Sequence, residues 1–156
     1  MRVVVRRFTR DDIQAIAFIE QQSVSSWSKE QVSAELDYDR SVSYCAVSES
    51  GAHLGWCTAR LVGGEAELLK IAVRNDSKRL GIGTLLFNHL VASLHARGVK
   101  DLFLEVRSQN IPAIHFYTRL GFQEIGRRNG YYKHPDDDGL LFKRIIEKGM
   151  GPEQGE

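Results

Sequence analysis

The stretch that decides the fold runs from Glu65 to Leu94 and reads EAELLKIAVRNDSKRLGIGTLLFNHLVASL. Its first part, Ala66 to Val73, is a short apolar run with β-branched residues, which predicts a strand buried on both faces. The polar segment Arg74 to Arg79 has no apolar periodicity and predicts a loop. From Ile82 onward leucines recur at helical spacing until Gly98, a residue type that ends helices. The predicted order is therefore strand, basic glycine-containing loop, helix.

The start of that helix is a candidate anion site. First-turn N–H groups have no intrahelical partners and lie at the positive end of the helix macrodipole. Gly81 and Gly83 lack a Cβ and let a bulky anion approach the backbone, while Lys78 and Arg79 add positive charge. A Walker loop is excluded because no lysine follows Gly83, and the dinucleotide fingerprint is excluded because Leu86 stands at its third glycine position. A plain strand-to-helix turn explains these residues equally well.

Length and charge limit the class of protein. With 156 residues and a net charge of +1, we expect one domain over residues 1–148, and we expect no direct binding of nucleic acid or membrane. The composition of residues 149–156, which is rich in glycine and acidic residues, predicts a disordered tail. The chain shows no signal peptide and no spanning helix, so we expect a cytoplasmic protein that is a monomer or a weak dimer. Cys45 and Cys57 fall on neighbouring predicted strands and are expected to be buried thiols, with a disulfide between them as the alternative.

The remaining pattern alternates strands and helices. Further strands are predicted at residues 2–8, 42–49, 53–62, 100–106, 122–128 and 140–146, and helices at 9–22, around Val32 to Leu36, and at 110–120. Capping signatures at Thr9 and Ser28 start the first two helices. The last two strands are expected to pair across a long polar loop. Together these elements predict a mixed α/β sandwich around one central sheet.

The motifs now support a family. The element order and the run from Lys78 to Gly83 resemble the GCN5-related N-acetyltransferase (GNAT) family, whose signature is Gln/Arg-x-x-Gly-x-Gly/Ala, with lysine at its first position here. The blocks Leu104 to Asn110, Leu120 to Phe122 and Arg127 to Tyr132 resemble the RimI-type ribosomal-protein-alanine N-acetyltransferases. The loop His134 to Gly139 matches no pattern. The resemblance implies a mostly antiparallel sheet of about seven strands, splayed between the fourth and fifth and flanked by about four helices.

The same resemblance implies acetyl-CoA as the donor and no metal. The pyrophosphate would lie on the backbone of the glycine loop, and the pantetheine arm would pair with the strand before it. A backbone N–H near Val73 would face the thioester oxygen. Asn110 is expected to cap its helix, to contact the cofactor, or both. The expected cofactor-binding residues are Ile71, Ala72, Val73, Lys78, Arg79, Leu80, Gly81, Ile82, Gly83, Thr84, Asn110 and Tyr117. The histidines and Asp136 to Asp138 lack metal-ligand spacing.

Acetylation of an amine needs a base for the amine and a proton for the departing thiolate. Glu105 is a carboxylate within an apolar strand, which suits a base acting directly or through a water. Its alternative is a solvated position on the face that it shares with Phe103. The resemblance places the hydroxyl of Tyr117 beside the CoA sulfur as the acid, and the alternative is a core aromatic. Tyrosine has a reference pKa of about 10 and is therefore protonated at neutral pH.

The acceptor of the acetyl group is the part of the function that the sequence determines least. Tyr131 and Tyr132 are expected to open the last loop and to hold an acceptor together with Trp27, whose alternative is packing on the core. Asp136 to Asp138 predict a solvated turn, or a border of the cleft that favours basic acceptors. The resemblance implies an Nα-acetyltransferase for a protein N-terminus, such as that of a ribosomal protein. An acetyltransferase for small amines and a non-catalytic acyl-CoA-binding module are the alternatives.

Overall fold

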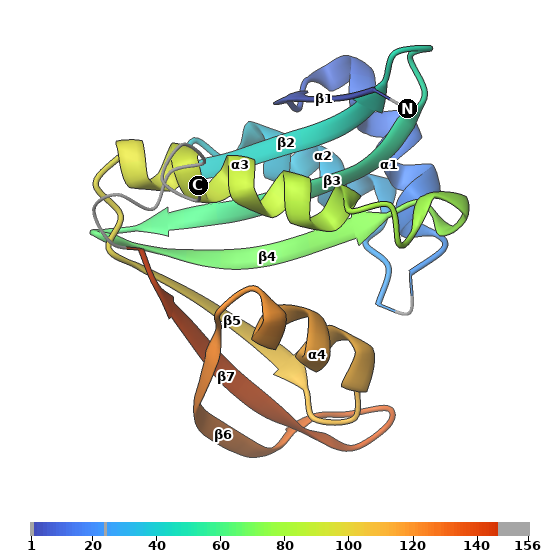
Figure 1. The fold of residues 1–156 in the computed structure, drawn as a ribbon. Coiled ribbons are helices and arrows are strands. Elements are labelled where there is room, and N and C mark those ends of the chain that lie inside the picture. Colours follow the sequence, from blue (N-terminus) through green and yellow to red (C-terminus); the bar gives the residue numbers. More distant parts are fainter. Residues whose placement is uncertain (1, 24, 147–156) are drawn as a thin grey trace.

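The computed structural model describes residues 2–23 and 25–146, so the tail expected at 149–156 lies outside the described residues (Figure 1). The helices are α1 Ile13–Glu20, α2 Lys29–Asp37, α3 Ile82–Ala96 and α4 Ile111–Arg119. The strands are β1 Val3–Arg7, β2 Ser41–Ser48, β3 His53–Val62, β4 Glu65–Val73, β5 Asp101–Arg107, β6 Gln123–Tyr132 and β7 Asp137–Ile145. Short 3-10 turns occupy Arg10–Asp12 and Asn75–Ser77.

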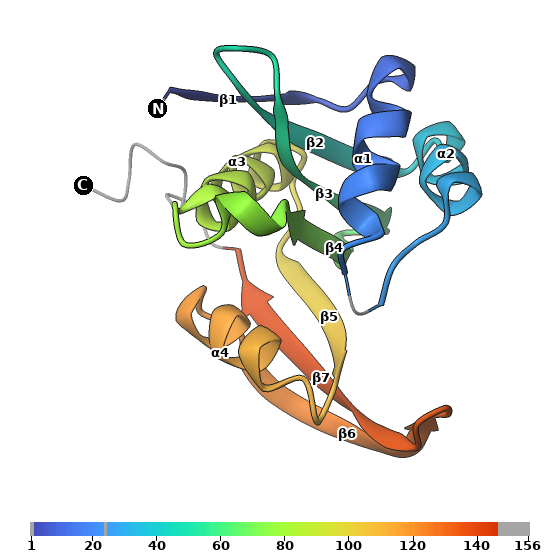
Figure 2. The same ribbon diagram turned by 90° about the vertical axis from the view of Figure 1, so that its right-hand side faces the viewer.

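One seven-stranded sheet joins these strands in the order β1-β2-β3-β4-β5-β7-β6. The pair β4–β5 is parallel and the other neighbouring pairs are antiparallel. In Figures 1 and 2, α3 and α4 lie on one side of the sheet, and α1 and α2 on the other. The predicted fold, a mixed and mostly antiparallel sheet flanked by helices, is confirmed.

The sheet splays between β4 and β5. These strands pair at Glu65–Asp101, Ala66–Leu102 and Glu67–Phe103, and their pairing ends there. Just beyond, the register of β4 against β3 shifts at Leu69, which forms a bulge. Figures 1 and 2 show β5 and β7 diverging from β4. The β4 edge that faces β5 is therefore unpaired from Leu68 to Val73.

The expectation that the strand from Ala66 to Val73 is buried on both faces is wrong, since only Ala66, Leu68 and Lys70 are buried. Glu65 and Glu67 are exposed, whereas Ala66 and Leu68 between them are buried. An acidic residue at every second position keeps one face of the strand in water, because a buried carboxylate without a partner is costly. Alternation, rather than continuous burial, describes this segment.

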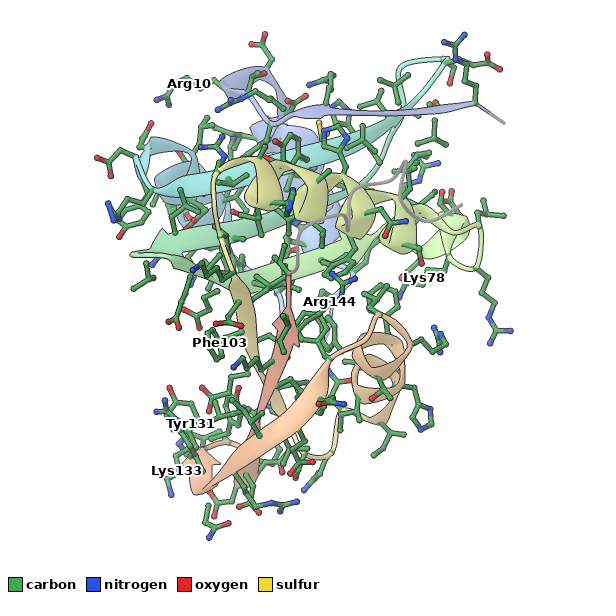
Figure 3. All side chains as sticks on the ribbon, turned by 60° about the vertical axis from the view of Figure 1, so that its left-hand side comes forward. Arg10, Lys78, Phe103, Tyr131, Lys133 and Arg144 are labelled. Carbon is green, nitrogen blue, oxygen red and sulfur yellow. The ribbon has the colours of Figure 1, made fainter. Side chains whose placement is uncertain are left out.

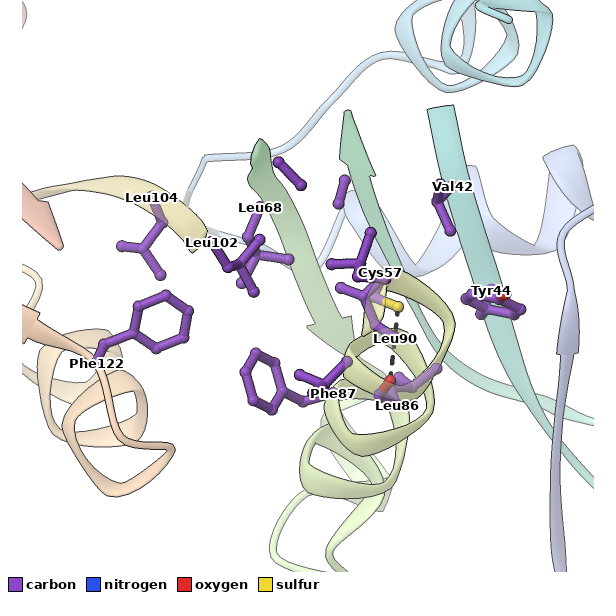
Figure 4. Packing of buried hydrophobic residues seen from close by; sticks show 14 of the residues in the cluster. Val42, Tyr44, Cys57, Leu68, Leu86, Phe87, Leu90, Leu102, Leu104 and Phe122 are labelled. Carbon is purple, nitrogen blue, oxygen red and sulfur yellow. Dashed lines mark hydrogen bonds between the residues drawn. The ribbon is translucent and has the colours of Figure 1, made fainter. Parts of the chain in front are cut away.

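The main core lies between α3 and the sheet (Figure 4). Leu86, Leu90 and Leu94 of α3 are fully buried, in agreement with the helical spacing of the sequence. Gly98 follows the helix with a φ of +80°, as expected of a C-terminal stop. Cys57 packs in this cluster and Cys45 in the second core, beneath α1 and α2. Both are free, as predicted, and burial raises the pKa of each thiol to about 12.

The β6–β7 hairpin is longer than the sequence indicates. Tyr131 and Tyr132 end β6 instead of opening a loop, and β7 begins at Asp137. Asp137 is buried, and its carboxylate accepts hydrogen bonds from the Ser108 hydroxyl and from the Gln109 N–H at 3.1 Å. The expectation of a solvated turn is therefore wrong for Asp137, because its partners come from another part of the chain and cannot be read locally.

Candidate active site

The start of α3 has the geometry of an anion site. Gly81 is its N-cap and adopts φ +79°, the left-handed region that glycine favours. Arg79 also has a positive φ of 66°, which is uncommon for a residue with a side chain and marks local strain. Within the described residues, no N–H from Arg79 to Thr84 donates to a protein group. These donors lie at the positive end of the helix, and the side chains of Lys78 and Arg79 are exposed beside them.

Gly83 has a different reason to lack a side chain. A Cβ at this position would lie 3.1 Å from the ring of Phe116 and 3.8 Å from a methyl group of Val73. The missing side chain therefore lets α4 pack closely against the first turn of α3. Sequence reasoning assigned Gly83 to the approach of an anion and missed Phe116, because a contact between two helices leaves no local signal. The two glycines thus serve backbone conformation and helix packing respectively.

The unpaired edge of β4 leads into this helix start. Ile71, Ala72 and Val73 are all partly exposed, and no strand of residues 2–23 or 25–146 pairs with their edge toward β5. Free N–H and C=O groups on such an edge can pair with an extended ligand. An extended group on this edge and an anion at the start of α3 can therefore belong to one ligand.

Glu105 faces the α1–α2 side of the sheet. Its neighbours Leu104 and Val106 are buried toward the other side, with α3 and α4. The Glu105 side chain is 15% exposed, and its buried Oε2 has no hydrogen-bond partner in the described part of the chain. The Nε of Arg128 lies 3.5 Å from that oxygen, and Gly139 on β7 leaves room for it. Glu105 therefore lies on the partly exposed face of β5, with a carboxylate that is largely enclosed.

Tyr117 lies on α4 among aromatic rings. Its ring centroid is 5.5 Å from that of Phe116 and 5.8 Å from that of Phe122. Burial raises the pKa of the hydroxyl to about 12, so the group stays protonated at neutral pH. The hydroxyl donates to no protein group among the described residues. The packing on the core that the sequence allowed is present, and the proton remains available.

The β6 side of Glu105 carries aromatic and basic side chains. Tyr131 and Tyr132 have ring centroids 5.0 Å apart, and the guanidinium groups of Arg128 and Arg107 lie over them at 5.0 and 4.3 Å. Burial raises the pKa of Tyr132, with the charge of Glu105 as the second cause. In Figure 3, Tyr131 lies on the side of the β5–β7–β6 layer opposite α4. Sequence reasoning missed both arginines, since cation–π pairs across strands have no local pattern.

Trp27 comes from the segment between α1 and α2. Its ring packs edge-on against Trp56, with centroids 5.5 Å apart, and its own side chain is partly exposed. Ser28, the next residue, accepts from Gln31 N–H at 3.1 Å and forms the predicted capping box. Packing on the core is therefore present, and the exposed part of the ring can still line a cleft.

Two further predictions concern Asn110 and metals. Asn110 caps α4, because its side-chain oxygen accepts from the Ala113 N–H at 3.3 Å.

Among the described residues, one cluster could offer three metal ligands, namely Asp12, Cys45 and His53. The Asp12 carboxylate already accepts hydrogen bonds from Arg6 at 2.8 and 2.9 Å and from His53 at 2.7 Å. This cluster therefore links β1 and β3 through hydrogen bonds, and both carboxylate oxygens of Asp12 are already used, so neither is free to bind a cation.

Comparison with known proteins defines the class of protein. Residues 10–122 match the acetyltransferase (GNAT) family, and the chain belongs to that family. Acetyltransferases of this family take their acetyl group from acetyl-CoA, so this donor suits the helix start and strand edge described above. The predicted family and cofactor are thereby confirmed.

Individual relatives narrow the comparison. The chain is 36% identical to the ribosomal protein bS18-alanine N-acetyltransferase of Escherichia coli over 82% of this chain and 84% of that protein. A crystal structure of the ribosomal-protein-S18-alanine N-acetyltransferase from Escherichia coli superposes with a TM-score of 0.85 at 30% identity, covering 94% of this chain and 95% of that one. Arabidopsis thaliana NAA60 in complex with acetyl-CoA shares the fold, with a TM-score of 0.82 at 21% identity over 93% and 99% of the two chains.

Proposed function

We propose that this acetyltransferase moves the acetyl group of acetyl-CoA to the α-amine of a protein N-terminus, and that the acceptor is a ribosomal protein. The observation that carries the proposal is the enclosed carboxylate of Glu105 next to the splay, whose buried Oε2 has no hydrogen-bond partner among the described residues. The Escherichia coli relatives, which are named for the alanine of ribosomal protein bS18, support a protein acceptor. A cytoplasmic location and a monomeric or weakly dimeric state belong to the same proposal.

The donor would be held by backbone groups. The N–H groups from Arg79 to Thr84 would bind its pyrophosphate, with Lys78 and Arg79 adding charge. The free edge of Ile71 to Val73 would pair with its pantetheine arm. The N–H near Val73 would stabilise negative charge on the thioester oxygen. Support comes from the unpartnered N–H groups at the start of α3 and from the absence of a paired strand beyond Glu67.

Two side chains would move protons. Glu105 would take a proton from the acceptor amine, directly or through a water, because a protonated amine has no lone pair for attack. Tyr117, whose pKa of about 12 keeps it protonated, would give a proton to the departing sulfur. The acetyl group supplied by the bound donor would then be joined to the amine nitrogen. Trp27 would contact the acceptor on one side, and Tyr131 and Tyr132 would contact it on the opposite side.

An N-terminal amine suits a single base of this kind. An α-amine has a reference pKa of about 7.7 to 8.0 and loses its proton far more easily than a lysine at about 10.4. Glu105 pairs with Arg128, and no second carboxylate takes part in this ion pair. Glu105 would therefore act as a single weak base. Protein N-termini are therefore favoured over lysine side chains.

The test compares classes of acceptor at equal concentration. Purified protein and acetyl-CoA are mixed with peptides that begin with alanine, serine or glycine, and separately with polyamines and aminosugars, and the products are weighed by mass spectrometry. We expect peptides to be acetylated at least about tenfold faster, since one positioned base gives about 10²–10⁴-fold acceleration for the right acceptor. Faster acetylation of the small amines would establish the alternative acceptor class, and absence of any turnover would support a binding module.

A further inference from the structure

The bulge at Leu69 changes the direction of the side chains that follow it. Leu68 lies opposite Ala59 and packs in the main core with α3, whereas Lys70 lies opposite Thr58 on the other side of the sheet. Without the extra residue, strict alternation would place Leu68 and Lys70 on the same face. The bulge therefore turns a lysine toward α1 and the segment that follows it.

Lys70 ends in an enclosed set of oxygen atoms. Its side chain is 9% exposed, and its Nζ lies 2.7 Å from the Ser25 carbonyl oxygen and 3.2 Å from Glu20 Oε1. The hydroxyls of Ser23 and Ser25 lie at 3.3 and 3.5 Å. All of these acceptors belong to the end of α1 or to the segment after it. A buried ammonium is stable here because it is paired and hydrogen-bonded.

Glu20 extends the same contact to Trp27. Its side chain is fully buried, its Oε1 accepts from the Trp27 N–H at 2.9 Å, and its Oε2 accepts from Trp56 Nε1 at 2.8 Å. The ion pair of Lys70 and Glu20 thus holds the segment that carries Ser23, Ser25 and Trp27 at several points. The segment is also tied to the turn after β4, where Gln22 Oε1 accepts from Asn75 N–H at 2.9 Å.

This segment lies where an acceptor would enter. In Figures 1 and 2 the described parts of this segment, residues 21–23 and 25–28, lie near the end of β4, on the side toward β5. Lys70 and Glu105 face the same side of the sheet, one on each of the two diverging strands. We propose that Lys70 is a positioning residue, which fixes the Trp27 wall of the acceptor site through Glu20 and the Ser25 carbonyl. The proposal rests on the proposed function, because it requires an acceptor between Trp27 and Glu105.

The experiment measures steady-state kinetics of Lys70→Met with the peptide that the wild type acetylates best. Methionine keeps much of the apolar length and removes the ammonium. A displaced Trp27 wall weakens the binding of peptide equally in the ground state and in the transition state, so we expect the KM for peptide to rise at least about tenfold. The KM for acetyl-CoA and the kcat at saturating peptide should stay within about threefold, since Glu105 and the donor site are untouched. Lys70→Arg, which keeps the charge and the donors, should restore most of the affinity for peptide.

The matched control is Arg60→Met. Arg60 forms an ion pair with buried Glu35 at 2.6 Å between β3 and α2, so its loss removes a comparable helix–strand contact away from the Trp27 segment. Arg60→Met should leave the KM for peptide unchanged. An equal rise in both variants, or a parallel fall of all kinetic parameters in Lys70→Met, would reduce Lys70 to a structural role and overturn the proposal.

Hydrogen–deuterium exchange of the same variants gives a readout independent of turnover. In Lys70→Met the peptide covering residues 21–28 should exchange faster, and in Arg60→Met it should not. Unchanged exchange in Lys70→Met would overturn the proposal. Where Lys70→Met fails to fold, Lys70→Gln, which keeps a shorter donor, should show the same selective rise in KM. A wild type that acetylates no peptide contradicts the proposed function, whereas an active wild type with an unchanged KM in Lys70→Met contradicts the role of Lys70 alone.

Discussion

At the scale of single residues, the two groups proposed to move protons have different surroundings. Glu105 keeps a buried oxygen without a hydrogen-bond donor and has a guanidinium 3.5 Å away. Tyr117 is packed between aromatic rings, and burial raises its pKa to about 12. A base benefits from an oxygen that no protein donor occupies, and an acid benefits from a proton that it does not lose at neutral pH.

Glu105→Gln keeps the shape of the side chain and removes its basicity. We expect turnover near neutral pH to fall by roughly 100-fold or more, because an amine must then lose its proton unaided. Turnover should recover in part as the pH rises toward the pKa of the acceptor amine. Initial rates at several pH values with a saturating peptide check this. Turnover like that of the wild type, with an unchanged pH profile, would remove Glu105 from the reaction.

Tyr117→Phe keeps the ring and its packing and removes the proton donor. We expect a loss in kcat with nearly unchanged affinity for acetyl-CoA, which is measured by steady-state kinetics and by calorimetry. Because burial raises the pKa of Tyr117 to about 12, the wild type should show no alkaline decline in rate from this group below about pH 11. An equal loss in affinity and in turnover would instead mean that the hydroxyl binds the donor.

At the scale of elements, the start of α3 depends on contact with α4. Gly83→Val should push the Phe116 ring away and disturb the first turn that would bind the donor. A ligand at about 100 times its Kd stabilises a native protein by roughly 2.7 kcal/mol. We expect acetyl-CoA to raise the melting temperature of the wild type and to do so much less for Gly83→Val.

Gly64 provides the control for that substitution. It lies in the turn between β3 and β4, where a Cβ would meet nothing within 4 Å. Gly64→Val should keep the full thermal shift. A wild type whose melting curve is unmoved by saturating acetyl-CoA would contradict the donor site, and a full shift in Gly83→Val would contradict the proposed dependence on helix packing.

Local patterns predicted the elements that depend on neighbours in sequence. The helical spacing of leucines in α3, the capping box at Ser28 and the cap by Asn110 are all present. The bulge at Leu69 was not predictable, because it depends on pairing with β3. The same holds for Asp137, whose partners Ser108 and Gln109 are 29 and 28 residues away in sequence. Contacts of this kind decide which carboxylates of the site are free.

The corrected hairpin changes one expectation about the acceptor. Besides the buried Asp137, the Asp138 carboxylate pairs with Arg127 at 2.7 Å and accepts from the Gly130 N–H at 2.8 Å. Two of the three consecutive aspartates are therefore used within the fold. The structure gives little support to a preference for basic acceptors based on this segment, because these charges are already compensated.

At the scale of the whole molecule, Asp12 joins the first strand and helix to β3. Its carboxylate is buried and contacts Arg6 of β1 and His53 of β3. Burial alone would raise its pKa, but the hydrogen bonds from Arg6 and His53 outweigh burial and hold the pKa well below its usual range. The ionised form therefore stabilises the fold above the unfolded-state pKa of about 4.

Acid should weaken this contact. As the pH falls from about 4 toward the lowered native pKa of Asp12, the unfolded chain takes up a proton that the folded chain does not, and stability falls. Asp12→Asn removes the charge at every pH and should lower the free energy of unfolding by about 1–3 kcal/mol at pH 7. From pH 7 to pH 3 the variant should then lose less stability than the wild type loses, because it lacks this titrating carboxyl group. Urea unfolding of both proteins at the two pH values checks this. Equal losses of stability in both proteins between pH 7 and pH 3 would mean that other groups control acid unfolding. None of the described helices is long and apolar enough to cross a membrane.

The central claim is that an N-terminal amine receives the acetyl group at the splay. Its most direct test is intact-mass measurement of two peptides that begin with alanine, contain one internal lysine and differ only in a free or a blocked N-terminus, each incubated with the protein and acetyl-CoA. The predicted result is one acetyl group on the free peptide and none on the blocked one, because the α-amine loses its proton far more readily than the lysine. Acetylation of the blocked peptide at its lysine, at a rate similar to that of the free peptide, would contradict the account.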